Sequence, residues 1–246
     1  MKEPIIKVRN LTARYGEQTI LEDITVDIFP EEVTVILGPS GCGKTTLLKN
    51  ILRLQQPASG YVEISGQNIT AMEELEYEKL LKHIGVLFQG GALLNSIDVF
   101  ENISIPLEQH TKLPREIIDK IIRVKLQLVN LSDALYKKPS ELSGGMKKRV
   151  ALARAISLDP DILFCDEPSA GLDPLTSASL DELILDLKKQ LRMTVVVVTH
   201  ELASIHRIAD KIIFLDEGKM LFNGTIKEAK NSKIKNITEF FRVGSF

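Results

Sequence analysis

A glycine-rich segment, GPSGCGKTT at residues 38–46, limits more than any other feature what this chain of 246 residues can fold into. An apolar run, Val33 to Leu37, precedes it, and a helical pattern starts at Lys44. Glycines in the loop allow backbone N–H groups to turn inward around an anion, and the start of the following helix adds the positive end of its dipole. A strand, this loop and a helix in that order predict a site for phosphate groups.

The residues that end this loop carry side chains suited to a nucleoside triphosphate. Lys44 supplies a point charge to the β- and γ-phosphates, the Thr45 hydroxyl is placed for Mg²⁺, and Thr46 reaches an α-phosphate. The alternative is a glycine turn that precedes a helix by chance. The strand and the helix on either side of the loop argue against it.

Two later apolar runs end in side chains that fit the same site. In DILFCDEP, residues 161–168, the run leads to Asp166, suited to hold Mg²⁺ through water, and Glu167, suited to polarise an attacking water as general base. TVVVVTH ends in His200, expected at the γ-phosphate as a donor or a water-positioning group. A solvated acidic pair and a structural histidine are the alternatives at these two strand ends.

The pattern of apolar residues predicts an α/β core that is split by a helical insert. Strand patterns cover residues 5–15, 19–29 and 31–38, and helical spacing dominates from about residue 74 to 158. After Asp161 strands and helices alternate, ending in a hairpin around Glu217 and Gly218. Strands that alternate with helices form a mostly parallel sheet with covered faces. The insert spans roughly residues 88–158.

Composition narrows the class of protein further. The formal net charge is −2, so no basic surplus is present to neutralise a nucleic acid, and we expect no nucleic-acid partner. Apolar runs stay well short of the 18 residues of a membrane span, and MKEPIIKVRN lacks the apolar stretch of a signal peptide, which predicts a soluble, cytosolic protein. Cys42 and Cys165 are expected to be reduced, buried or half-buried thiols in that compartment.

A second predicted anion site lies in ELSGGMKKRVALARAI, residues 141–156, where Ser143, Gly144 and Gly145 open a helix. This segment resembles the signature of ATP-binding cassette (ABC) ATPases. The other motifs of that family follow in its order over about residues 4–225. Tyr15 resembles the aromatic residue that stacks on adenine, Gln89 the Q-loop glutamine, SAGLD at 169–173 the D-loop, and His200 the switch histidine.

The resemblance implies a P-loop NTPase of the ABC-ATPase fold with ATP and Mg²⁺ as cofactors. Its RecA-like mixed sheet core would cover residues 1–88 and 159–225, with an N-terminal antiparallel β subdomain, an inserted α-helical subdomain at 89–158 and a C-terminal tail at 226–246. Catalysis would use Glu167, His200 and Gln89, and the metal would be held by Thr45, Gln89 and Asp166. Nucleotide contacts would come from Tyr15, Gly38, Pro39, Ser40, Gly41, Cys42, Gly43, Lys44, Thr45, Thr46, Ser143, Gly144, Gly145 and Asp173.

The family also implies partners. Two copies would meet head to tail around two ATP molecules, and hydrolysis would let them part. With no membrane span of its own, the chain would serve as motor subunit on an integral-membrane permease, peripheral on the cytoplasmic face of the inner (plasma) membrane. Stand-alone cassettes that act on DNA or ribosomes are the competing class. They usually carry two cassettes, coiled-coil inserts or basic arms, which this sequence lacks.

Residues 87–107 point to a subgroup. Phe88-Gln89, the GAL stretch that ends at Leu93, and V-x-x-N-I-x-x-P-L from Val99 to Leu107 resemble the maintenance-of-lipid-asymmetry (Mla) cassettes, which move phospholipids between inner and outer membranes. That subgroup implies an MlaE-like permease, an MlaD-like lipid-binding subunit and sometimes a small regulatory subunit. The alternatives are an importer ATPase for polar solutes such as amino acids, and a lipoprotein-release or efflux cassette.

Family members usually have glutamine after LSGG, and Met146 replaces it here, as the Mla subgroup favours.

Three features of the sequence allow two interpretations each. Lys147, Lys148 and Arg149, which follow Met146, form either a solvated helix face or a functional run. Ala92, Leu93, Leu94 and Phe100 either pack within the helical subdomain or receive a cytoplasmic helix of the permease. Tail residues Phe240, Phe241 and Phe246 either pack on their own domain or clasp the opposite subunit.

Overall fold

The computed structural model of this chain describes residues 3–243 and divides into two compact units. One unit comprises residues 1–77 together with 196–246, and the other comprises residues 78–195. The division falls inside two elements, α2 (Glu74–Leu81) and β8 (Thr194–Val198). Within the described residues, no helix is both long and apolar enough to cross a membrane.

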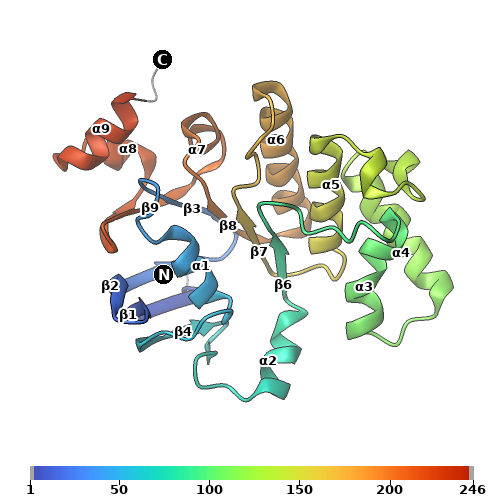
Figure 1. Cartoon of the computed structure of the whole chain (residues 1–246), viewed down its shortest axis with the longest axis horizontal. Helices are drawn as coiled ribbons and strands as arrows, with labels where there is room; N and C mark the ends of the chain where they lie inside the picture. Colours follow the sequence, from blue (N-terminus) through green and yellow to red (C-terminus); the bar gives the residue numbers. More distant parts are fainter. Residues whose placement is uncertain (1–2, 244–246) are drawn as a thin grey trace. The chain divides into compact units, whose positions relative to one another are not determined.

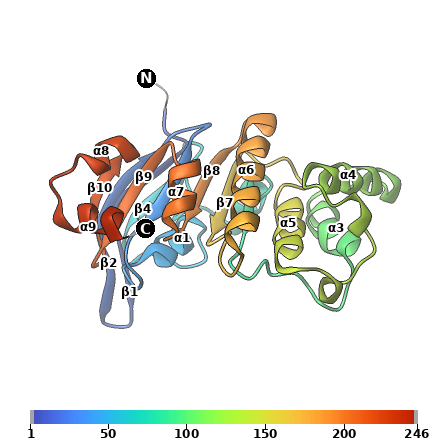
Figure 2. The same cartoon turned by 90° about the horizontal axis from the view of Figure 1, so that it is seen from above.

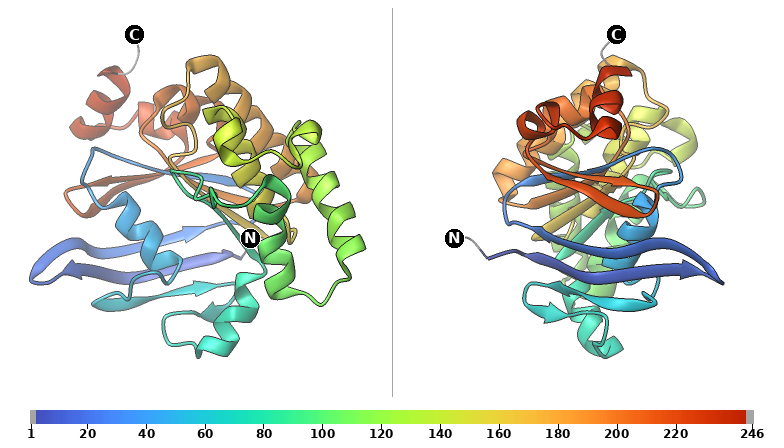
Figure 3. Two further views of the ribbon diagram at one scale, coloured as in Figure 1. Left: turned by 45° about the vertical axis from the view of Figure 1, so that its right-hand side comes forward. Right: turned by 90° about the vertical axis from the view of Figure 1, so that its left-hand side faces the viewer.

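An antiparallel sheet forms the start of the first unit, with the strand order β2-β1-β4-β5. Its members are β1 (Ile6–Tyr15), β2 (Gln18–Ile28), β4 (Ser59–Ile64) and β5 (Gln67–Asn68). Figures 1 and 3 show the long β1 and β2, in blue, side by side. Burial alternates along β2: Ile24, Val26 and Ile28 are buried while Thr25 is exposed. Sequence patterns did not predict the β4–β5 pair.

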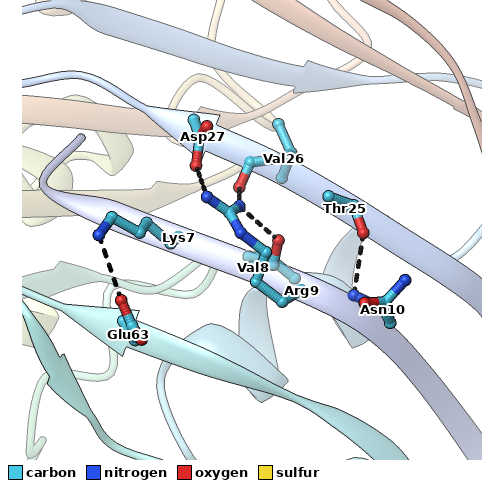
Figure 4. Close-up of polar contacts among 8 residues, drawn as sticks. All are labelled: Lys7, Val8, Arg9, Asn10, Thr25, Val26, Asp27 and Glu63. Atoms are coloured by element: carbon cyan, nitrogen blue, oxygen red, sulfur yellow. Dashed lines mark hydrogen bonds and ion pairs between the residues drawn. The ribbon is translucent and has the colours of Figure 1, made fainter. Parts of the chain in front are cut away.

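Polar side chains on this sheet link neighbouring strands. Arg9 of β1 forms an ion pair with Asp27 of β2 at 2.6 Å, and Lys7 forms one with Glu63 of β4 at 3.4 Å (Figure 4). Arg9 also donates to the backbone oxygens of Val8 and Val26. These contacts hold the register on the partly exposed face.

The rest of the first unit carries the phosphate loop. Strand β3 (Val33–Leu37) is buried on both faces and runs parallel to β9 (Lys211–Asp216), which pairs antiparallel with β10 (Lys219–Gly224). The predicted hairpin is confirmed, since Glu217 and Gly218 have φ of 45° and 76°, as a primed turn requires. The helices that lie wholly within the described part of this unit are α1 (Lys44–Ile51), α7 (Leu202–Ile208), α8 (Ile226–Lys230) and α9 (Lys235–Val243).

The second unit joins two parallel strands to a group of helices. Strand β6 (Ile84–Leu87) ends two residues before Gln89 and pairs with β7 (Ile162–Asp166). Helices α3 (Val99–His110), α4 (Arg115–Leu128) and α5 (Gly144–Ala155) gather together in Figure 2, and α6 (Pro174–Leu191) follows β7 in the chain. Pro114 is the N-cap residue of α4.

The aromatic residues of the tail pack on their own unit. Phe240 meets Phe214 of β9 edge to face with ring centroids 5.4 Å apart, and Phe241 lies 5.8 Å from His206 of α7. The interpretation that they pack on their own domain therefore holds for these two residues. Phe246 lies outside the described residues.

Candidate functional site

The phosphate loop connects β3 to α1 through backbone conformations that require glycine. Gly38, Gly41 and Gly43 have φ of 148°, 81° and 107°. A Cβ at Gly38 would lie 2.0 Å from the Leu215 oxygen, and one at Gly43 would lie 2.5 Å from Leu21 Cδ2. A Cβ at Gly41 would enter open space, so that only its backbone angle demands glycine. Close packing of the loop against β9 and β2 therefore requires glycine at positions 38 and 43.

Lys44 places its charge over this loop. Its Nζ donates to the Gly38 oxygen at 2.8 Å and to the Pro39 oxygen at 2.9 Å, and the residue is only 8% exposed. Thr45 is exposed, whereas Thr46 is buried and its backbone oxygen accepts from Asn50. No side chain in the described part of the chain caps the start of α1. The free N–H groups, the ammonium and the helix dipole together suit a polyphosphate.

Three other predicted residues of the first unit are accessible. Pro39 and His200 line one cavity of about 560 Å³, whose other lining residues include Phe214 and Phe240. His200 follows β8 and is exposed. Tyr15, at the end of β1 beside Gly16, is 50% exposed, so that its ring has a free face. These positions are compatible with the predicted contacts to the γ-phosphate and the adenine ring.

In the second unit one buried ammonium joins two predicted site residues. Lys148 of α5 is 7% exposed, and its Nζ donates to the backbone oxygen of Gln89 and, at 3.3 Å, to that of Glu167. Glu167 follows β7 with a left-handed φ of 45°, which is strained for a residue with a side chain. Gln89 is exposed, and Asp166 and Glu167 are half-buried.

The two remaining motifs lie at helix starts. Ser143 caps α5 by accepting from the Met146 N–H at 3.2 Å, and a Cβ on Gly145 would lie 2.6 Å from Thr176 Cγ2. Asp173 caps α6 by accepting from the N–H groups of Leu175 and Thr176 at 3.1 Å each. A hydrogen bond from the Thr176 side chain, together with these N–H groups, holds the pKa of the Asp173 carboxyl below its usual value. Ser143 and Gly144 are exposed, as an anion-binding helix start requires.

The donor set fits a magnesium ion that depends on its nucleotide. Among residues 3–243, no cluster of three or more His, Cys, Asp or Glu side chains could hold a metal alone. Mg²⁺ is usually bound by one or two protein groups together with substrate phosphates and water. A hydroxyl at Thr45 and a carboxylate at Asp166 are the kind of oxygen ligands that such an ion prefers.

Comparison with known proteins decides the family. The sequence matches the family described as "ABC transporter" over residues 21–170. It is 38% identical, over 98% of its length, to the Haemophilus influenzae "Intermembrane phospholipid transport system ATP-binding protein MlaF", of which it covers 92%. The Escherichia coli K12 protein of that name is 37% identical over 96% of this chain and is 88% covered.

This chain belongs to the ABC transporter family. It is therefore an ATP-binding, ATP-hydrolysing subunit. A Mycobacterium leprae relative, "Probable ribonucleotide transport ATP-binding protein mkl", is 43% identical over 84% of this chain, which spans 60% of that protein.

Solved ABC structures share the fold. The cbiO1 protein of Clostridium perfringens, part of the ABC transporter complex cbiONQ, superposes with a TM-score of 0.86 at 30% identity, covering 99% of this chain and 98% of that one. A dimeric bacterial ABC cassette, MJ0796, gives 0.82 at 31% identity, covering 90% and 98%. The predicted P-loop ABC-ATPase fold is confirmed.

In this ABC ATPase, the interpretation of the basic run after the signature as a solvated face is wrong for Lys148, which is buried. Arg149 is also engaged, donating to the Val129 oxygen at 3.0 Å and to Ser179 Oγ at 2.8 Å. Arg154 donates to the oxygens of Gly91 and Ala92 at 2.8 Å each. Sequence patterns missed Lys148 and Arg154 as neighbours of the Q-loop, because a lysine or arginine on a helix carries no signal of its acceptor.

Proposed function

We propose that this ABC ATPase powers a transporter that moves phospholipids between the inner and outer membranes. The observation that carries the proposal is the similarity, over nearly the whole chain, to two proteins named as ATP-binding subunits of intermembrane phospholipid transport. The stretch from Phe88 to Leu107, which first indicated the lipid subgroup, lies within the matched region. Importers of polar solutes, lipoprotein-release systems and efflux systems remain the alternatives.

Each predicted site residue would have a separate role in ATP binding or hydrolysis. The loop at 38–46 binds the phosphates through its N–H groups and Lys44, while Tyr15 stacks on the base. Thr45, Asp166 and Gln89 would hold Mg²⁺, which neutralises phosphate charge when bound. Glu167 accepts the proton of the attacking water, and His200 donates to the γ-phosphate.

Two copies would form the working unit. The starts of α1 and α5 are two predicted anion sites, and Lys44 at the first of them lies within the phosphate loop of its own chain. Ser143, Gly144 and Gly145 would bind the γ-phosphate held by a second copy, with Asp173 beside them, as in a head-to-tail homodimer. MJ0796 is described as dimeric, which supports this arrangement. Loss of the γ-phosphate would release the pair.

The permease would contact residues 89–158, which we propose as the helical subdomain. Leu94 of this segment is 51% exposed. The same segment contains a groove of about 720 Å³, which is lined by Asp98, Phe100, Glu101, Arg115, Glu116, Asp119, Lys120 and Tyr136. Phe100 itself is buried, with the Arg115 guanidinium 5.4 Å from its ring, and serves packing. Leu94 is the candidate contact for an MlaE-like permease on the cytoplasmic face of the inner membrane, where MlaD-like and small regulatory subunits would join.

Reconstitution with the cognate permease and its lipid-binding subunit tests the proposal. In proteoliposomes, ATP should drive transfer of a fluorescent phospholipid to the lipid-binding subunit, while labelled amino acids and ribonucleotides are not taken up. The same assembly carrying Glu167→Gln should bind ATP yet slow hydrolysis and transfer about 10²–10⁴-fold, the usual worth of a general base.

The transport assay and the hydrolysis assay test the proposal independently. Uptake of amino acids or ribonucleotides without phospholipid transfer would replace the lipid by a polar solute. Turnover by Glu167→Gln at the rate of the unsubstituted chain would remove Glu167 from the chemistry. Asp186→Asn, a neutralised carboxylate on α6, serves as the matched control and should leave hydrolysis unchanged.

A further inference from the structure

Helix α5 carries a lysine whose burial calls for an explanation. Lys148 lies five residues after the signature serine and is 7% exposed. An ammonium removed from water needs acceptors for its three N–H groups. Two of its acceptors are main-chain oxygens that lie 59 and 19 positions away in the sequence, those of Gln89 and Glu167.

Helix α5 also holds Gly91 and Ala92, the residues of the Q-loop that follow Gln89 and Gly90. Arg154 donates to the oxygens of Gly91 and Ala92, and a Cβ on Gly91 would lie 3.4 Å from the Ala151 Cβ. Bonds from charged donors are stronger than neutral ones. Gly90 and Gly91 lack side chains, so their φ and ψ angles are less restricted than those of other residues. In the folded chain the two cations of α5 therefore restrain a segment that the sequence alone would leave flexible.

Glu167 also needs a restraint. Its φ of 45° lies in the left-handed region, which costs energy for a residue with a Cβ and persists only when its surroundings enforce it. The carbonyl oxygen that Lys148 binds belongs to this strained residue. The carbonyl carbon of Glu167 is bonded to the Cα that carries the side chain. Holding the carbonyl therefore restricts rotation about the Cα–C bond and, with it, the direction of the Glu167 side chain.

We propose that Lys148 is a positioning residue for ATP hydrolysis. By holding the carbonyls of Gln89 and Glu167 to one ammonium, it sets the separation and direction of the two side chains that orient and deprotonate the attacking water. It also links both to the helix that begins with the signature. This inference rests on the roles proposed above for Gln89 and Glu167.

Lys148→Met tests the inference, because methionine keeps the length and apolar stem of the side chain and removes the ammonium. We expect kcat to fall about 10- to 100-fold, the cost of misplacing a reacting group by about an ångström. KM for ATP and nucleotide affinity should change less than about threefold, because the phosphate contacts at 38–46 are untouched. Lys147→Met, the neighbouring lysine on α5, is the matched control and should be nearly unchanged.

Two further variants separate positioning from simple loss of stability. Lys148→Arg keeps the charge and should restore much of kcat, and Lys148→Gln, with one amide donor group, should lie between the two. If Lys148→Met does not fold, as judged by thermal unfolding, the comparison rests on these two. Amide hydrogen exchange at residues 88–92 should be faster in every Lys148 variant that loses kcat.

A double substitution gives the decisive result. If Lys148 acts through Glu167, adding Lys148→Met to Glu167→Gln should cost little more than Glu167→Gln alone. Additive losses, or normal kcat in folded Lys148→Met, would overturn the inference. If Glu167→Gln itself retained full turnover, the proposed function of the site would fail instead, so the two failures are distinguishable.

Discussion

At the scale of the residue, the two cysteines show how position controls chemistry. Cys42 lies in the phosphate loop and Cys165 in β7, and both are free and buried. Burial raises the pKa of both thiols, and that of Cys165 reaches about 12. A thiol that stays protonated and inaccessible is a poor nucleophile. The expectation from the sequence that both thiols are buried or half-buried is therefore confirmed.

We predict that neither cysteine of the native protein reacts quickly with a thiol reagent at pH 8, whereas both react in urea. Fast native labelling of Cys165 would contradict the prediction.

A second prediction concerns pH and stability. Because the Cys165 pKa is raised from 9.0 to about 12, the contribution of the Cys165 thiol to the free energy of unfolding is present below pH 9 and is lost as the pH rises toward 12. The loss should be about 1.4 kcal/mol for each pH unit in that window. Urea unfolding at pH 8, 9.5 and 10.5 measures it, and Cys165→Ala should show a shallower decline.

At the scale of the element, a buried asparagine explains the N of the V-x-x-N-I pattern. Asn102 of α3 is fully buried, and its side chain accepts from the Leu94 N–H at 2.8 Å and donates to the oxygens of Leu94 and Asp98 at 3.1 and 2.9 Å. A capping box between Asp98 and Glu101 begins the same helix. The segment after the Q-loop is thus attached to α3 by a single amide.

Asn102→Ala should lower the free energy of unfolding by about 2 kcal/mol, because it leaves the N–H of Leu94 without its partner. Equilibrium urea unfolding measures the loss. Asn95→Ala, an exposed asparagine in the same segment, is the control and should stay within about 0.5 kcal/mol of the unsubstituted protein. Equal effects of the two substitutions would show that the buried amide is dispensable.

At the scale of the whole molecule, ATP should act as the link between two copies. In Glu167→Gln, which binds ATP and hydrolyses it slowly, sedimentation velocity should show a monomer without nucleotide and a dimer with ATP. Adding Gly144→Asp places a negative charge at the exposed start of α5, so the ATP-dependent dimer should be lost. Folding should survive, because a Cβ at this position would lie 3.6 Å from Leu172, an ordinary van der Waals distance. Asn95→Asp adds the same charge elsewhere and should leave the dimer intact; a dimer that tolerates Gly144→Asp would refute the shared site.

Much of this protein could be predicted because its signals are local. The residues of GPSGCGKTT are adjacent in the chain, and the glycine conformations at 38, 41 and 43 follow from the loop itself. The helix at 174–191 and the hairpin at 211–224 were likewise expected from their periodicity and turn residues. Strand β4 was not, since SGYVEI is short and its partner in the sheet, β1, lies about fifty residues earlier in the chain.

Sequence by itself determined the family, the phosphate loop and the order of the motifs, because each depends on residues within one turn or one strand end. Tertiary structure alone decided which groups hold those motifs in place. Lys147 and Lys148 are identical neighbours in the sequence, yet only Lys148 is buried against the carbonyls of Gln89 and Glu167. A hydrogen bond to a distant main-chain oxygen leaves no mark on the identity of its acceptor, since every residue has that oxygen.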